Sequence, residues 1–219
     1  MKLLSVNIGQ ERTLQRKDHV EQTGILKVPT SKPSKITRLG FEGDVIISKK
    51  HHGGPDQAIY IYGMPDYEWW TKKLGKEIQP GTFGDNLTIS ELESALFDIG
   101  DYFHIGAVTL QVTAPRIPCG TFAAHMDDPQ WVKKFRHAER PGLYCRVVKE
   151  GFVIIDDKVS VEEYSGETLS ILQMYREYYD RNKSEASLRR HLNAPIAIRA
   201  QKDLEEKLEN LLAVKASKG

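Results

Sequence analysis

The first 165 residues are divided into short segments that favour β-strands, and this pattern most constrains the fold. The segments are rich in β-branched and aromatic residues, which suit a pleated sheet surface. Gly, Pro and Asp residues separate them and indicate turns. The segments are residues 2–8, 23–29, 43–48, 58–63, 86–90, 101–106, 108–115, 142–148 and 158–164. Several short strands at modest spacing predict a β-barrel or a β-sandwich.

Two parts of the chain read as helical instead. Residues 64–75 predict a short helix, with Pro65 near its start, Asp66 in its first turn and Gly75 after its end. After Ser165 and Gly166 the composition changes, and residues 168–180, 184–194 and 195–214 predict three helices with apolar stripes. We therefore expect a β domain at residues 1–165 and a three-helix domain at residues 166–219.

Composition excludes several functional classes. The chain has 219 residues and a formal net charge of +1, so no global charge favours binding to a nucleic-acid polymer or a membrane surface. No apolar run approaches the roughly 20 residues of a membrane span, and the start lacks the apolar core of a signal peptide. Two cysteines do not make a disulfide framework. We expect a cytoplasmic protein with reduced thiols.

The segment "TAPRIPCGTF", residues 113–122, carries the clearest chemical signal. Cys119 follows Pro118 and stands three residues after Arg116, so a nearby cation would favour the thiolate, which attacks carbon or binds metal. A proline-flanked turn presents a side chain rather than hiding it. Cys145 lies in a strand-like segment with Leu143 on the same face, which predicts a buried structural thiol.

Two glycine-rich turns offer further candidate site residues. In "HHGGPDQAIYIYG" the amides of Gly53 and Gly54 could hold an anion or a flat ligand, and His52 could donate a hydrogen bond or bind a metal. The alternative is a solvated surface turn. In "GTFGDNLTIS" Asn86 can hydrogen bond to a ligand edge, although turn and strand formation explains most of that segment.

Five motifs in order along the chain resemble the MOSC domain family: "GFEGD", "HHGGPDQAIYIY", "GTFGDNLTI", "IGDYFHIG" and "TAPRIPCGTF". The resemblance covers roughly residues 1–165, and the tail resembles the three-helix appendage of the YiiM-type subgroup. It implies a mainly β fold, a MOSC-type β-barrel with a C-terminal three-helix appendage. The chain departs from the family after Asp44, where "VIISKK" lacks the usual acidic residue.

The resemblance also implies a cofactor and an activity. The family carries the molybdenum cofactor, a molybdopterin, and Cys119 would be the metal ligand. Related enzymes reduce N-hydroxylated compounds such as 6-hydroxylaminopurine and other base analogues, which detoxifies them. His52 would support catalysis and contact the cofactor. The other cofactor contacts would be Lys27, Gly53, Gly54, Asn86 and Arg116, with Lys49 and Lys50 as further candidates for its phosphate.

Such a reductase needs an electron source. The chain shows no cysteine cluster for an iron–sulfur centre and no dinucleotide-binding fingerprint, which implies an external flavin or iron–sulfur reductase. Two alternatives stay open at this point. Cys119 and His52 could form a nucleophile pair in a hydrolase or a sulfur-transfer enzyme, or the chain could be a non-catalytic cofactor carrier. Whether it forms a homodimer is also open.

Overall fold

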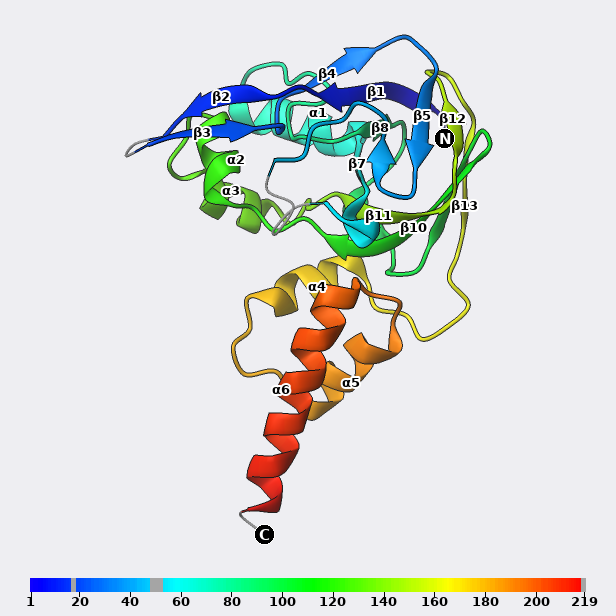
Figure 1. The fold of residues 1–219 in the computed structure, drawn as a ribbon. Helices are drawn as coiled ribbons and strands as arrows, with labels where there is room; N and C mark the ends of the chain where they lie inside the picture. Colours follow the sequence, from blue (N-terminus) through cyan, green and yellow to red (C-terminus); the bar gives the residue numbers. More distant parts are fainter. Residues whose placement is uncertain (17–18, 48–52, 218–219) are drawn as a thin grey trace.

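The computed structural model describes residues 1–16, 19–47 and 53–217, and it shows a β-rich body with helices packed at one end (Figure 1). The main sheet has eight strands in the order β13-β9-β10-β11-β7-β8-β1-β4. Neighbouring strands are antiparallel except for the parallel pair β7 and β8. The strands are β1 (Leu3–Gly9), β4 (Lys27–Thr30), β7 (Ile59–Gly63), β8 (Leu87–Ile89), β9 (Tyr102–Ile105), β10 (Val108–Pro115), β11 (Leu143–Lys149) and β13 (Val159–Glu162).

Smaller elements complete the body. A three-stranded sheet has the order β12-β5-β6, and β2 and β3 form a separate antiparallel pair. Their bounds are β2 (Arg12–Gln15), β3 (Val20–Thr23), β5 (Ser34–Thr37), β6 (Gly40–Phe41) and β12 (Gly151–Val153). The described residues also form two 3-10 turns and six α-helices: η1 (Pro55–Gln57), η2 (Ser94–Leu96), α1 (Met64–Leu74), α2 (Gly120–His125), α3 (Trp131–Ala138), α4 (Ile171–Tyr178), α5 (Glu185–Asn193) and α6 (Ile198–Ala216).

The expected β-barrel is confirmed only in part: the body is rich in strands, but the main sheet is an open series of strands. Its two edges, β13 and β4, do not pair with each other among the described residues. The start of β1 does approach β13: the Leu3 amide donates to the Asp157 carbonyl at 3.0 Å, and the Asp156 amide donates to the Leu3 carbonyl at 2.9 Å. From Val6 onward β1 pairs with β4 instead, so this contact does not extend into a ladder.

The predicted helix at 64–75 is confirmed as α1. Pro65 lies in its first turn, and Gly75 ends it with φ of 66°, a left-handed conformation that favours glycine. Most predicted strands are also present. The segment 43–48 is an exception, because its described part, residues 43–47, forms a turn and irregular backbone. The sequence patterns missed the short elements β2, β3, β5, β6, β12, α2 and α3.

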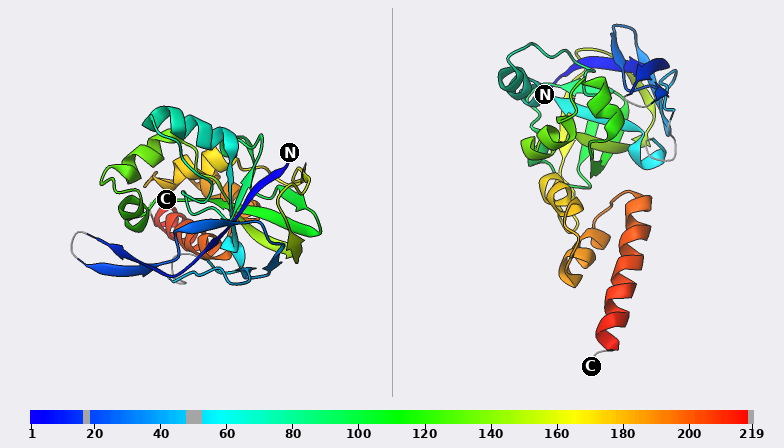
Figure 2. Two further views of the ribbon diagram at one scale, coloured as in Figure 1. Left: turned by 90° about the horizontal axis from the view of Figure 1, so that it is seen from above. Right: turned by 90° about the vertical axis from the view of Figure 1, so that its left-hand side faces the viewer.

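Three helices follow Gly166, as predicted. The Ser184 hydroxyl accepts a hydrogen bond from the Ser187 amide at 3.1 Å and caps α5. Figure 2 shows α6 projecting away from the β-rich body. The body and the helical segment nevertheless share one apolar cluster, to which Leu169, Ile171, Leu188, Ile196 and Leu204 contribute. The proposed domain boundary near residue 165 therefore stays a prediction.

A second, aromatic cluster lies beneath α1, α2 and α3. Its buried members are Tyr60, Tyr62, Tyr67, Trp70, Ile78, Phe83, Phe122, Trp131 and Phe135. Two of its polar side chains have buried partners: the Tyr67 hydroxyl donates to Asp85 at 2.6 Å, and the Trp70 indole donates to the Tyr62 hydroxyl at 2.9 Å. The indole nitrogen of Trp131 has no hydrogen-bond partner among the described residues. Tyr60 of this cluster also lines the candidate site described next.

Candidate active site

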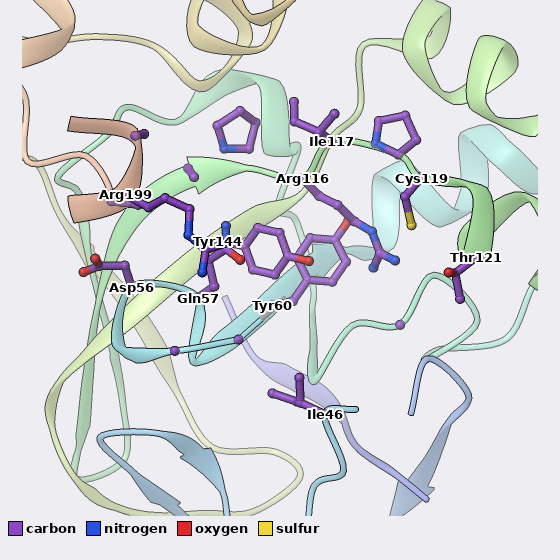
Figure 3. Close-up of a pocket in the computed structure, with 18 of the residues that line it drawn as sticks. Ile46, Asp56, Gln57, Tyr60, Arg116, Ile117, Cys119, Thr121, Tyr144 and Arg199 are labelled. Atoms are coloured by element: carbon purple, nitrogen blue, oxygen red, sulfur yellow. The ribbon is translucent and has the colours of Figure 1, made fainter. Parts of the chain in front are cut away.

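A pocket of about 860 Å³ lies between the β-rich body and the helical segment. Residues from the ends of β10 and β4, from the turn before β7 and from α6 all line it. Figure 3 shows its interior, with Cys119 and Arg116 at one end, Tyr60 and Tyr144 in the middle and Arg199 at the other end. This volume is within the range of small-molecule sites in proteins.

Cys119 lies on the wall of this pocket. It follows the end of β10 and precedes α2 in an extended conformation, with φ of −127° and ψ of 174°. It is half-buried, whereas Cys145 in β11 is fully buried, as predicted. Burial raises the pKa of the Cys145 thiol. Neither cysteine is in a disulfide. The structure thus separates one thiol beside a pocket from one thiol in the core.

Arg116 supplies a buried cation beside Cys119. Its guanidinium donates to the Phe83 carbonyl and lies over two aromatic rings, 4.4 Å from the centroid of Phe122 and 4.9 Å from that of Tyr60. Burial lowers the pKa of Arg116, but interactions with the pocket tyrosines and Cys119 outweigh burial, so its pKa lies above the ordinary value. The cation therefore stays charged and fixed next to the thiol.

A second guanidinium, that of Arg16, lies beside Gly120, the residue after Cys119, and was missed by sequence reasoning. A Cβ placed on Gly120 would lie 2.4 Å from Arg16 Nη2, so the absence of a side chain at Gly120 leaves room for this cation. Arg16 Nη1 also lies 3.3 Å from Glu21 Oε2. Burial raises the pKa of Glu21, but hydrogen bonds from Thr121 and Arg16 outweigh it and lower that pKa. No sequence motif includes Arg16, which directly follows the mostly exposed strand β2.

Lys27, Asp44 and Asn86 form a buried polar group on the pocket wall. Lys27 Nζ lies 2.6 Å from both carboxylate oxygens of Asp44. Asp44 also accepts from the Gly9 amide at 2.6 Å and from Asn86 Nδ2 at 2.9 Å. Asn86 Oδ1 accepts from the Tyr60 amide at 3.1 Å. Burial lowers the pKa of Lys27, and the Asp44 carboxylate opposes this shift.

These bonds bear on the expected cofactor contacts of Lys27 and Asn86. Both residues line the pocket, but their polar atoms have protein partners that hold β1, β4 and β8 together. Their direct contact with a cofactor stays a prediction. Sequence reasoning missed Asp44 as the partner of Lys27, although it lies inside the "GFEGD" motif.

The glycine pair adopts the predicted backbone. Gly53 and Gly54 have φ of 81° and 86°, which favours glycine, and both line the pocket. Among the described residues, and apart from its two chain neighbours, no atom lies within 4 Å of the place that a Cβ on Gly54 would take. The glycine backbone is therefore open on that side to a bound molecule. The predicted residues His52, Lys49 and Lys50 lie outside the described residues.

His125 in α2 links this helix to the loop beneath it, since its Nε2 lies 2.9 Å from the Thr82 carbonyl. Burial lowers the pKa of His125 from 6.5. The unfolded chain then binds a proton at a higher pH than the folded chain does, so stability falls as the pH drops through about 6.5.

We expect His125→Gln to weaken this acid sensitivity, because its amide can still donate to the carbonyl without titrating. Chemical unfolding at about pH 7.5 and about pH 5.5 measures the effect. An equal loss of stability on acidification in both proteins would contradict the assignment.

Within residues 1–16, 19–47 and 53–217, no three His, Cys, Asp or Glu side chains gather as a metal site. In the same ranges, none of the helices has both the length and the apolar character needed to span a membrane.

Comparisons with known proteins identify the class. The model of the MOSC domain family matches residues 48–160, which is more than half of the chain. The chain belongs to the MOSC domain family.

Individual relatives are similar over much of its length. Uncharacterized protein YflK from Bacillus subtilis is 34% identical over 151 residues, covering 69% of this chain and 68% of YflK. Protein YiiM from Escherichia coli is 30% identical over 137 residues, covering 61% of each chain. The crystal structure of YiiM from Geobacillus stearothermophilus shares the fold with a TM-score of 0.77 and 23% identity, covering 94% of this chain and 98% of that one.

Proposed function

We propose that this chain binds the molybdenum cofactor and reduces N-hydroxylated compounds, including N-hydroxylated base analogues such as 6-hydroxylaminopurine. One observation carries the proposal: the Cys119 sulfur opens onto a pocket beside the fixed cation of Arg116. Membership of the MOSC family supports the cofactor. A protein named "Reductase" from Gibberella moniliformis, 28% identical over 166 residues that make up 29% of its length, supports the reaction class.

The residues of the pocket fit such a cofactor. A soft thiolate suits a metal that already carries sulfur ligands from its own pterin, and Cys119 would supply one further sulfur. The open backbone at Gly54 leaves room for a flat ring system or a phosphate group. Arg16 and Arg116 provide positive charge at the thiol end although the net charge of the chain is only +1.

When bound, the cofactor supplies two-electron oxygen-transfer chemistry. The overall reaction converts R–NH–OH, two electrons and two protons into R–NH₂ and water: the N–O bond breaks, and nitrogen is reduced. The electrons come from an external flavin or iron–sulfur reductase, which we propose as the partner.

The residues of the chain would bind and orient the cofactor and the substrate. Cys119 would hold the metal. The Arg116 side chain is packed between Phe122 and Tyr60 and keeps a positive charge facing the thiol. Tyr144 and Ile117 line the same pocket and give it apolar surface beside the thiol. Arg16 follows β2 and lies next to Gly120 at the start of α2, so a second guanidinium is close to Cys119.

The proposal predicts cofactor content and turnover. Protein made in a host that synthesises the molybdenum cofactor is expected to contain molybdenum and pterin, each approaching one equivalent per chain. With a chemically reduced dye as electron donor, it is expected to convert 6-hydroxylaminopurine to adenine. Elemental analysis, pterin fluorescence and product chromatography measure these results.

The same samples test the alternatives. Zinc without molybdenum, together with hydrolysis that iodoacetamide blocks, would contradict the proposal and favour a cysteine hydrolase. A full complement of molybdenum with no reduction from any dye or reductase would favour a cofactor carrier.

A further inference from the structure

The helical segment contributes one end of the pocket, and that end has its own chemistry. The residues of α6 and its neighbours that line it are Met174, Tyr178, Asp180, Lys183, His191, Ala197, Arg199, Ala200, Asp203, Leu204 and Lys207. Figure 3 shows Arg199 reaching from the start of α6 toward Gln57 and Tyr144, at the end of the pocket opposite Cys119. The function proposed above leaves this end without a role.

Charge at this end is not fully compensated. Asp56 is neutralised, because it lies 3.0 Å from Arg146 Nη2 and accepts from the Ile198 amide at 2.8 Å. Lys183 donates to the carbonyls of Glu177 and Asp180. Among the described residues, the Arg199 side chain forms no ion pair or hydrogen bond. Arg199 therefore presents its guanidinium to whatever enters this end of the pocket.

A second, independent observation lies beside it. Gln57 Oε1 is buried and has no hydrogen-bond partner among the described residues. Gln57 lines the same pocket. A buried acceptor without a partner lowers stability. This oxygen has almost no accessible surface, so a hydroxyl or amino group of a ligand reaches it only when the Gln57 side chain turns toward the pocket.

Between the two ends lies the half-buried ring of Tyr144, which packs against the buried ring of Tyr60. The rings of Tyr60 and Tyr144 lie 4.9 Å apart at an angle of 39°. The Tyr60 hydroxyl donates to the Pro141 carbonyl at 2.8 Å, which fixes this ring. A planar heterocycle can stack on the exposed part of the Tyr144 ring. The order along the pocket is therefore a thiol, an aromatic surface, an unpartnered acceptor and a guanidinium.

We infer that Arg199 binds a phosphate monoester, so that the pocket accepts a nucleotide-like ligand rather than only a free base. A guanidinium binds phosphate through paired, charge-assisted hydrogen bonds, and Gln57 accepts from a sugar hydroxyl or an amino group. The phosphate comes either from the substrate or from the cofactor. The inference deepens the function proposed above, and the direction of the substrate in the pocket rests on that function.

The test is a calorimetric titration of the full-length chain with adenosine 5′-monophosphate and with adenosine. We expect the wild-type chain to bind the monophosphate more tightly than the nucleoside. Arg199→Gln is expected to weaken binding of the monophosphate about tenfold or more and to leave adenosine binding unchanged. Arg199→Lys is expected to restore part of the difference. Arg181→Gln is the control, since it removes the same charge from an exposed residue outside the pocket lining.

The pterin content of each variant, made in a cofactor-producing host, separates the two sources of phosphate. A selective loss of monophosphate binding with unchanged pterin content assigns the phosphate to the substrate. A fall in pterin content in Arg199→Gln, but not in Arg181→Gln, assigns it to the cofactor. If Arg199→Gln changes neither quantity, the inference is overturned. The titration needs neither molybdenum nor turnover, so its result stands even if the reductase assignment fails.

Discussion

Cys119→Ser is expected to abolish reduction of N-hydroxylated substrates while the protein stays folded. Loss of a residue that only orients a ligand typically costs 10–100-fold in metal affinity or activity, so loss of the metal ligand itself should cost about 100-fold or more. Serine is a favoured residue at the start of a helix, and position 119 precedes α2, so the free energy of unfolding should change little. Molybdenum content, turnover and thermal unfolding are the measurements.

Cys145→Ser is the matched control, because it changes the same atom in the core. A hydroxyl buried among apolar side chains without a good partner lowers stability by about 1–3 kcal/mol. Molybdenum content and turnover should remain those of the wild type under conditions in which the variant is folded. Full activity in Cys119→Ser would remove the sulfur of Cys119 from the proposed site.

Asp44→Ala is expected to be among the most destabilising single substitutions in the chain. The carboxylate is almost inaccessible, with 3% of its side chain exposed, and Lys27 is 8% exposed. Removing one partner of a buried ion pair leaves the other charge uncompensated, which typically costs about 3–5 kcal/mol. The change also removes the acceptor of the Gly9 amide and of the Asn86 side chain. Denaturant unfolding measures the loss.

The partner variant makes this prediction specific. Lys27→Met should cost less, because Asp44 keeps the Gly9 and Asn86 donors. The double variant Lys27→Met, Asp44→Leu should be more stable than Asp44→Ala, since no buried charge is left alone. If Lys27→Met and Asp44→Ala cost the same, the hydrogen bonds to Gly9 and Asn86 have little energetic weight.

The sequence predicted local structure where its signals were local. Pro65, Asp66 and Gly75 fixed the ends of α1, and Ser184 fixed the start of α5. Short strands with mostly exposed side chains, such as β2 and β3, carry no apolar alternation and were missed. The predicted barrel was also not found in full. Whether the sheet closes depends on which strand pairs with β1 on the side away from β8, and strand composition does not determine this pairing.

The candidate site was partly predictable for the same reason. A proline-flanked cysteine after a strand is visible in the chain, so Cys119 and Arg116 were found. Pairings between distant segments were not: Lys27 with Asp44 joins residues 17 positions apart, and Arg199 comes from a helix that begins almost 80 residues after Cys119. The first contact forms only when β4 packs beside the segment that follows β6, and Arg199 reaches the pocket only once the helical segment packs against the body.

Residues of the β-rich body and of α6 line the same pocket, so a bound molecule would contact both parts of the chain and stabilise their packing. Binding free energy adds to the stability of the conformation that binds. The packing of α6 against the rest of the protein would then be more stable when the pocket is occupied. Resistance of the peptide bond after Glu163 to proteases would measure that occupancy.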